Sequence, residues 1–219
     1  MISKIIIITS IGALAFFGTM NAQEINFGVK AGYSLSSIKA EGAGAPEYDS
    51  KSSFYIGGLV KYKLTDKVDL QGELLYSETG GKYSESSSET MGGTTYSLKM
   101  ESDLKFGNLM LPVSVKYYLA ENISLSGGLN FALILTAKAI LSTEISGGGM
   151  SEKRTETEDI KKDIKSLNFA PFVGAEYQLP NGIFFDARYN LGLTNLVKDP
   201  EGDESARNSF LQIGIGYKF

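Results

Sequence analysis

The chain has 219 residues, with 21 basic and 25 acidic side chains and neither histidine nor cysteine. The net charge of −4 argues against a nucleic-acid partner. Without histidine and cysteine, Ser–His–Asp hydrolysis, histidine-ligated metal sites and thiolate chemistry are excluded. We therefore expect no catalytic residue, no cofactor and no metal.

The N-terminal segment has the features of a signal peptide. Lys4 precedes an apolar run, residues 5–18, which is too short for a helix that crosses a bilayer core of about 30 Å. A candidate cleavage point follows Ala22. We predict that residues 1–22 are removed on export and that residues 23–219 form one domain. Since no later apolar run suits a membrane helix, a closed β-barrel is the structure that could satisfy its backbone in lipid.

Alternation of apolar and polar residues predicts eight β-strands in the rest of the chain. In the first strand, Phe27, Val29 and Ala31 alternate with Gly28 and Lys30. Crossing the hydrocarbon core needs about 9–11 residues tilted near 45°, and each predicted strand is long enough. The predicted strands are residues 24–36, 53–64, 68–78, 104–119, 123–137, 167–179, 183–195 and 208–219.

The connections between these strands alternate in length. Residues 65–67, 120–122 and 180–182 are short turns, whereas residues 37–52, 79–103, 138–166 and 196–207 are long polar segments. Short turns at one end and long loops at the other are typical of an outer-membrane barrel with periplasmic termini. The expected fold is an all-β, eight-stranded, antiparallel, up-and-down transmembrane barrel with extracellular loops.

Two observations favour an apolar face turned towards lipid over a soluble periplasmic carrier, whose apolar side would line a cavity. The alternate face is rich in glycine, serine and asparagine, as suits a narrow lumen. Large aromatic residues gather at two depths, as in the girdles of membrane barrels. Those near the short turns are Phe27, Tyr62, Tyr117, Tyr177, Tyr217 and Phe219, and those near the long loops are Tyr33, Phe54, Tyr76 and Phe169.

The last nine residues, LQIGIGYKF, alternate up to the final aromatic residue. We expect this strand to pair with the first strand, because an open edge in lipid would leave backbone groups unpaired. Phe219 would then lie in the periplasmic girdle. An aromatic C-terminus of this kind also resembles the signal that barrel-assembly machinery recognises.

Three segments resemble the PorT-like outer-membrane β-barrel family, often called "porin family protein". They are FGVKAGYSLSS in the first strand, LPVSVKYYLAENISLSGGLNFAL in the central hairpin and FVGAEYQLPNGIFFDARYNLGLTNL in the sixth and seventh strands. The resemblance implies a small integral outer-membrane barrel without a shared catalytic motif. Some members of that family serve protein secretion.

Charged residues recur on the inward face of the predicted barrel. They could line an ion or proton path, or pair with one another as a structural plug. An eight-stranded barrel is just wide enough for its own side chains, which favours the plug. We predict a structural network of Lys30, Glu73, Lys116, Glu176, Asp186 and Arg188, accompanied by Lys61, Asp69 and Lys218. Tyr118, Phe172 and Phe210 would fill the remaining lumen.

Two charged segments lie in the predicted loops. Residues 151–165, SEKRTETEDIKKDIK, balance acids and bases, as in a solvated and partly helical loop. They could instead dock a partner or contact lipopolysaccharide. The acidic residues at 199, 201, 203 and 204 alternate like those of a calcium loop but lack its full pattern.

The sequence thus predicts a monomeric outer-membrane barrel with a structural, surface-interaction or secretion-accessory role. Its expected partners are the bilayer, lipopolysaccharide, the assembly machinery and a protein at the extracellular loops. A narrow pore or transport component is the first alternative, and a soluble periplasmic carrier is the second.

Overall fold

The structure, a computed structural model, describes residues 25–42, 45–200 and 202–219. The predicted signal peptide, residues 1–22, lies outside the described residues. The described residues form nine β-strands: β1 (Ile25–Glu41), β2 (Asp49–Lys63), β3 (Val68–Met91), β4 (Thr94–Ala120), β5 (Ile123–Gly147), β6 (Met150–Asp159), β7 (Leu167–Gln178), β8 (Ile183–Asn190) and β9 (Ser205–Lys218). Within those ranges, no helix is long and apolar enough to cross a membrane.

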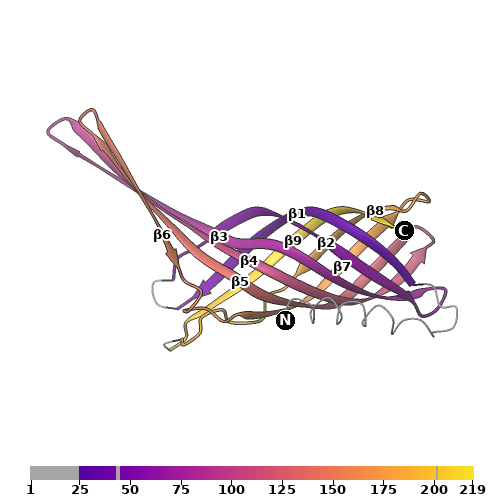
Figure 1. The fold of residues 1–219 in the computed structure, drawn as a ribbon. Coiled ribbons are helices and arrows are strands. Elements are labelled where there is room, and N and C mark those ends of the chain that lie inside the picture. Colours follow the sequence, from indigo (N-terminus) through magenta and orange to yellow (C-terminus); the bar gives the residue numbers. More distant parts are fainter. Residues whose placement is uncertain (1–24, 43–44, 201) are drawn as a thin grey trace, which may run out of the picture.

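The strands close into a ring of antiparallel neighbours (Figure 1). The sheet order is β4-β3-β2-β1-β9-β8-β7-β5-β6, and pairing of β4 with β5 closes it. The last strand pairs with the first over a long register, with Gly32 opposite Gly214 and Leu35 opposite Leu211. The predicted closure and the all-β, up-and-down barrel class are confirmed.

The predicted count of eight strands is wrong by one. β5 pairs with β7 through its first half, residues 123–133, and with β6 through its second half, residues 138–147. β6 and β7 therefore follow one another along the same edge of β5. The chain leaves the sheet between them, at residues 160–166, where it forms turns and an isolated bridge between Ile164 and Val197.

Two of the predicted long loops are mostly strand. Residues 79–103 belong to β3 and β4, and residues 138–159 belong to β5 and β6. Each pair of strands is joined by two glycines with positive φ, Gly92 and Gly93 at 59° and 79°, and Gly148 and Gly149 at 60° and 83°. Two successive residues in the left-handed region form the tight turn that suits the twist of a hairpin. The expectation of a partly helical loop at residues 151–165 is wrong, because residues 151–159 belong to β6 and residues 161–163 form a turn.

Other strand boundaries differ by a few residues from those predicted. β1 continues to Glu41 and β2 begins at Asp49, so the first outer connection is shorter than expected. β8 ends at Asn190 rather than at residue 195. β9 begins at Ser205 rather than at residue 208, so the outer connection after β8, residues 191–204, is only slightly longer than predicted.

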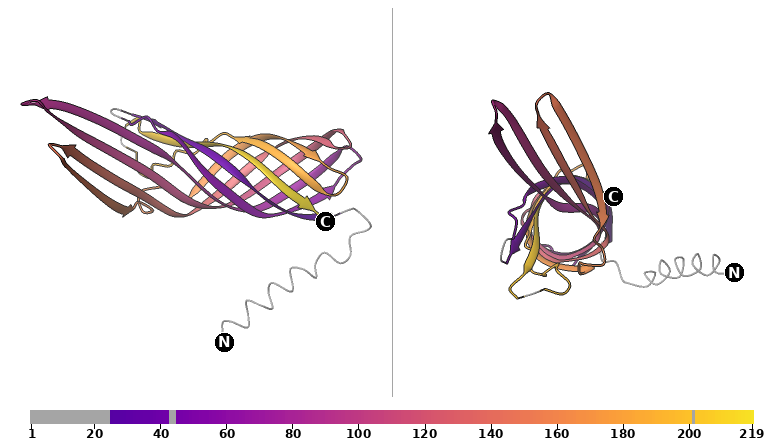
Figure 2. Two further views of the ribbon diagram at one scale, coloured as in Figure 1. Left: turned by 90° about the horizontal axis from the view of Figure 1, so that it is seen from above. Right: turned by 90° about the vertical axis from the view of Figure 1, so that its left-hand side faces the viewer.

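The strands β3, β4, β5 and β6 continue beyond the rest of the ring as a four-stranded sheet. We call residues 83–103 and 138–159 the projecting sheet. β2 stops pairing with β3 at Asp49 and Lys82, so β3 beyond that point is an open edge. Both hairpins rise from one side of the ring (Figure 2). A register shift of one residue between β4 and β5 at Gly107 and Asn108 precedes the projecting part, and such a bulge bends and twists a strand pair.

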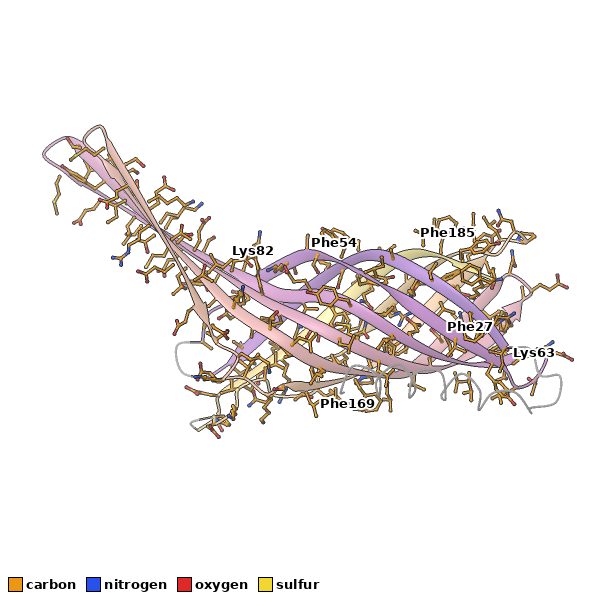
Figure 3. The ribbon with its side chains drawn as sticks, in the orientation of Figure 1. Phe27, Phe54, Lys63, Lys82, Phe169 and Phe185 are labelled. Carbon is orange, nitrogen blue, oxygen red and sulfur yellow. The ribbon has the colours of Figure 1, made fainter. Side chains whose placement is uncertain are left out.

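Side chains along the barrel wall alternate between two environments. Apolar residues point outward and are exposed, including Phe27 at 59% and Phe54 at 79% (Figure 3). The alternate residues, among them Lys30, Ser34 and Ser36, are buried inside the ring. The wall is thus apolar outside and polar inside, the reverse of a soluble carrier.

The folded protein is expected to keep its barrel in SDS until it is boiled. Every strand of the wall is held by hydrogen bonds to a neighbour on each side, so no edge offers a starting point for unfolding. Samples run with and without boiling should therefore migrate differently on a gel. Identical migration, together with release from membranes by alkaline carbonate, would contradict an integral barrel.

Candidate functional site

The barrel interior contains a cluster of four charged side chains that crosses the lumen. Arg188 of β8 donates from Nη2 to both carboxylate oxygens of Glu73 of β3, at 2.7 and 2.9 Å, and lies 3.3 Å from Asp186. Lys30 of β1 donates to Asp186 at 2.7 Å, and its Nζ lies 3.5 Å from Glu73. Because β3 and β8 are not neighbours in the ring, these contacts bridge the barrel from wall to wall.

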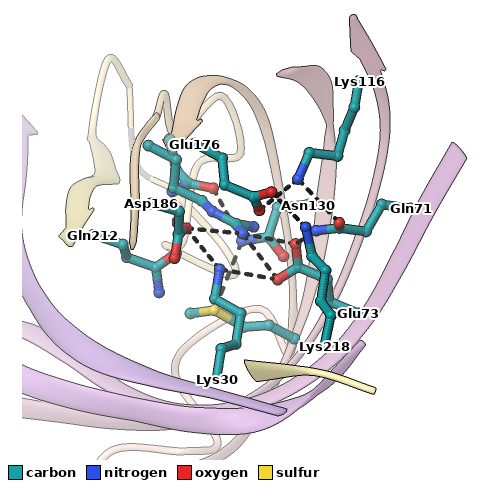
Figure 4. A network of polar contacts seen from close by, with 12 residues as sticks. Lys30, Gln71, Glu73, Lys116, Asn130, Glu176, Asp186, Gln212 and Lys218 are labelled. Atoms are coloured by element: carbon teal, nitrogen blue, oxygen red, sulfur yellow. Dashed lines mark hydrogen bonds and ion pairs between the residues drawn. The ribbon is translucent and has the colours of Figure 1, made fainter. Parts of the chain in front are cut away.

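A second cluster is centred on Glu176 of β7. The lysine Nζ atoms of Lys116 and Lys218 each lie 2.5 Å from one of its carboxylate oxygens. Gln71 links the two clusters, since it accepts from Lys116 at 3.2 Å and donates to Glu73 at 2.7 Å (Figure 4). The charges therefore form one continuous network.

The structure brings together all six residues of the predicted lumen network. They are between 2% and 8% exposed. Of the accompanying charges, Lys218 lies in the Glu176 cluster, and Lys61 pairs with Asp69 at 3.1 Å near the short-turn end. Buried charges are tolerated only when they are paired, because desolvation is costly. Mutual pairing of this kind suits a structural plug.

Apolar side chains close the lumen above these charges. One buried cluster consists of Tyr55, Leu75, Met110, Ala132 and Phe210. A second cluster, nearer the outer mouth, consists of Ile38, Phe106, Ile134, Ala137 and Leu196. The cavity beside the ion pairs has a volume of about 10 Å³, which is no more than one water molecule needs. An ion that followed the charges towards the outer mouth would meet these two apolar clusters.

The girdle residues named from the sequence lie on the outer wall or at its ends. Tyr117, Tyr177 and Tyr217 are between 43% and 47% exposed, and Phe219 is 72% exposed. Tyr62 is half-buried. The rings of Tyr217 and Phe219 meet edge to face, with centroids 5.4 Å apart. The four tyrosines come from β2, β4, β7 and β9, and Phe219 directly follows β9, near the end that carries the short turns.

One inward charge and the full length of the projecting sheet escaped the sequence analysis. Lys51 is buried at the outer mouth and pairs with Asp103 at 2.7 Å and Glu78 at 3.4 Å. Its alternation with Ser53 and Tyr55 could have indicated an inward position. The alternation that continues at Tyr83 and Leu141 predicts that the sheet extends beyond the membrane. The full length of the projecting sheet was missed, although the Gly-Gly pairs that close its hairpins were a usable signal.

Lys99 and Glu101 form an exposed ion pair on one face of the projecting sheet. The hydrogen bond from Lys99 holds the pKa of the exposed Glu101 carboxyl below its usual range, and that carboxylate raises the pKa of Lys99. In the described part of the chain, no three His, Cys, Asp or Glu side chains gather in a group that could hold a metal ion. Residue 201 of the acidic segment lies outside that part.

Solved outer-membrane barrels resemble this chain at low identity. Ail from Yersinia pestis is 18% identical, and the match covers 90% of this chain and 99% of Ail with a TM-score of 0.44. Neisserial surface protein A is 14% identical, with coverage of 88% and 97% and a TM-score of 0.44. OprG from Pseudomonas aeruginosa is 15% identical, with coverage of 90% and 97% and a TM-score of 0.39.

No curated protein matches this sequence. The family described as "Outer membrane protein beta-barrel domain" matches residues 21–198, which is most of the chain and includes β1 to β8. This chain therefore belongs to the outer membrane protein beta-barrel domain family, and it is a β-barrel of the outer membrane.

Proposed function

We propose that this protein is a non-conducting, non-enzymatic barrel that presents its projecting sheet to a partner outside the cell. The observation that carries the proposal is the length of β3, β4 and β5, which have 24, 27 and 25 residues. Crossing the membrane needs only about 9–11 residues per strand. The excess residues build an ordered platform, and binding residues commonly collect on such extensions of a rigid scaffold.

The filled interior supports the non-conducting part of the proposal. The paired charges and the two apolar clusters leave no continuous space beside Glu73 and Arg188. A narrow pore should give reproducible single-channel conductance in planar bilayers, and we expect none. Membership of an outer-membrane family speaks against the soluble carrier.

We also propose the branch of the family and the partners that the sequence suggested. The strand motifs favour a PorT-like branch of the family and leave a secretion-accessory role open. Lipopolysaccharide would surround the outer wall, and barrel-assembly machinery would recognise the aromatic C-terminus at Phe219. The absence of histidine and cysteine from the chain supports a non-enzymatic role.

The test removes the projecting sheet and leaves the barrel closed. Replacing residues 84–101 and residues 140–157 each with Asn-Gly joins Tyr83 to Ser102 and Ala139 to Glu158, which are opposite one another in the ladders. Met91–Thr94 and Gly147–Met150 are the pairs that flank the native two-residue turns. The new end pairs lie an even number of residues from them along each strand, so they have the same position in the hydrogen-bonding pattern, and a type I′ turn should close each hairpin. We call this protein the hairpin-shortened variant.

The hairpin-shortened variant should fold and shift on heating like the wild type but lose its partners. Photo-crosslinking on intact cells, followed by purification, measures the partners that each variant captures. An Arg188→Met variant serves as the lumen control and should capture the wild-type set if it folds. The proposal fails if the hairpin-shortened variant keeps that set while a folded Arg188→Met variant loses it.

A further inference from the structure

The two faces of the projecting sheet differ in chemistry. Residues that are opposite one another in adjacent antiparallel strands share a face, and the face alternates along each strand. The ladders β3–β4, β4–β5 and β5–β6 run without a register shift through the projecting sheet. Each residue can therefore be assigned to one of two faces, and one face continues the inner wall of the barrel.

The face that continues the inner wall is apolar along its two central strands. Leu98 lies opposite Ile145, and Ser102 lies opposite Leu141. The large apolar side chains of this face are between 36% and 77% exposed. They are Met91, Tyr96, Leu98, Met100, Leu141, Ile145 and Met150. No exposed large apolar side chain of the projecting sheet lies on the other face. A contiguous exposed patch of this kind marks an interaction surface.

Acidic side chains border this apolar face on both edge strands. β3 contributes Glu85 opposite Met100 and Glu89 opposite Tyr96. β6 contributes Glu152, Glu156 and Glu158, with Arg154 as the single basic residue. Five carboxylates against one guanidinium leave a net charge of four negative on this face. Arg154 is itself paired with Glu156 at 2.6 Å.

The opposite face has no such excess. Its charged residues are Lys99, Lys138, Lys153, Glu101, Asp103, Glu144 and Asp159. Three positive and four negative charges leave a net charge of only one negative, and Lys99 pairs with Glu101 at 2.7 Å. The negative charge of the projecting sheet is therefore concentrated at the margins of the apolar face.

The dimensions of the apolar face match one α-helix. Two neighbouring strands are about 4.8 Å apart, so β4 and β5 present a stripe about as wide as a helix with its side chains, about 10 Å. Leu104 continues this face one residue beyond the projecting sheet. From Tyr96 to Leu104 the stripe covers eight residue steps along β4, about 27 Å at ~3.4 Å per residue. An α-helix of about 18 residues has the same length.

We propose that the apolar face of the projecting sheet binds an amphipathic α-helix of a partner protein, whose apolar stripe is flanked on both sides by lysine or arginine. This inference rests on the proposed function and names the face and the partner chemistry. Leu98, Met100, Leu141 and Ile145 contact the stripe, and the carboxylates of β3 and β6 pair with the flanking cations. A second copy of this face is disfavoured as the partner, because its acidic margins would lie against the acidic margins of the first copy. A lipid surface is disfavoured for a similar reason, since lipid phosphates are also anionic.

The test uses the full barrel in phosphatidylcholine nanodiscs and two synthetic 18-residue helical peptides. Both peptides carry the same leucine stripe, which is flanked by lysine in one and by glutamate in the other. The lysine peptide should bind wild-type discs at least tenfold more tightly than the glutamate peptide or than empty discs. Its affinity should fall as salt is raised, because the flanking pairs are exposed.

Matched variants separate the two faces. Leu98→Ser/Leu141→Ser/Ile145→Ser should weaken binding of the lysine peptide at least tenfold, whereas Lys99→Ser/Glu144→Ser on the opposite face should stay within twofold of the wild type. All of these side chains are partly or largely exposed, so each variant should still shift on heating. That gel shift checks that the barrel has folded.

Reversal of the margin tests the charge requirement. Glu85→Lys/Glu152→Lys/Glu158→Lys should lose the lysine peptide and gain the glutamate peptide. Equal affinity of the two peptides, or unchanged binding by the triple serine variant, overturns the proposal. So does equal binding to empty discs, which indicates a lipid surface, or pairing of discs through this face, which indicates a second copy.

Failure here is distinguishable from failure of the proposed function. If the lysine peptide does not bind but the hairpin-shortened variant still loses its crosslinked partners, the projecting sheet remains the functional part and only the face or its chemistry is wrong. If the hairpin-shortened variant keeps those partners, the proposed function itself fails.

Discussion

Arg188→Met is expected to destabilise the folded barrel by about 3–5 kcal/mol, the usual cost of leaving one partner of a buried ion pair behind. Glu73 would lose its two short hydrogen bonds to the guanidinium and would keep only Gln71 and the more distant Lys30. Asp186 would also lose one cation. Urea unfolding of the barrel reconstituted in vesicles measures the change in the free energy of unfolding.

Removing both partners should restore most of that loss. In Glu73→Leu/Arg188→Met the uncompensated carboxylate is gone, while Lys30 and Asp186 remain paired at 2.7 Å. Lys99→Met, which breaks an exposed pair of the projecting sheet, is the surface control and should leave the unfolding midpoint unchanged. A single Arg188→Met variant as stable as the wild type would contradict the plug, because it would mean that water reaches Glu73.

Phe219→Ala is expected to reduce the amount of barrel at the cell surface severalfold while changing its stability little. The ring is 72% exposed and contacts Tyr217, so its truncation costs little burial, on the order of 1 kcal/mol. The backbone N–H of Phe219 still donates to the carbonyl of Phe27 at 2.9 Å and keeps the end of the chain in place. A large loss in cells would therefore reflect recognition during assembly.

The matched control for that experiment is Phe185→Ala. Phe185 is an outward aromatic residue of β8 that is 47% exposed and does not belong to the C-terminal strand (Figure 3). Surface levels are measured by labelling intact cells, and stability is measured by urea unfolding of refolded protein. Equal surface levels for Phe219→Ala and Phe185→Ala would leave Phe219 only an interfacial role.

Much of the barrel was predictable because alternation carries the information locally. Strand side chains point to opposite faces in turn, so a run such as Phe27 to Tyr33 identifies its own outer and inner residues without any knowledge of the neighbours. Closure of β9 onto β1 followed from the cost of an open edge in lipid. The six predicted lumen charges are buried in the structure, because they occupy the inward positions of the same alternation.

The projecting sheet was less predictable because the signal there is weaker. Outside the membrane both faces of a strand can be polar, so serine- and glutamate-rich stretches such as residues 84–90 give no clear period of two. The division of residues 150–178 into β6 and β7 depends on which half of β5 each one pairs with. That choice is made by long-range pairing and not by local propensity.

The sequence by itself determined the membrane barrel, its outer face and the inward charges other than Lys51, since each follows from the local period and from the backbone demands of lipid. Only the tertiary structure decided which charges meet. Arg188 and Glu73 are 115 residues apart in the chain and join across the lumen. The tertiary structure also placed Leu98 beside Ile145, with the acidic strands β3 and β6 on either side of them. Register and ring closure set these distances, and neither is encoded in any single strand.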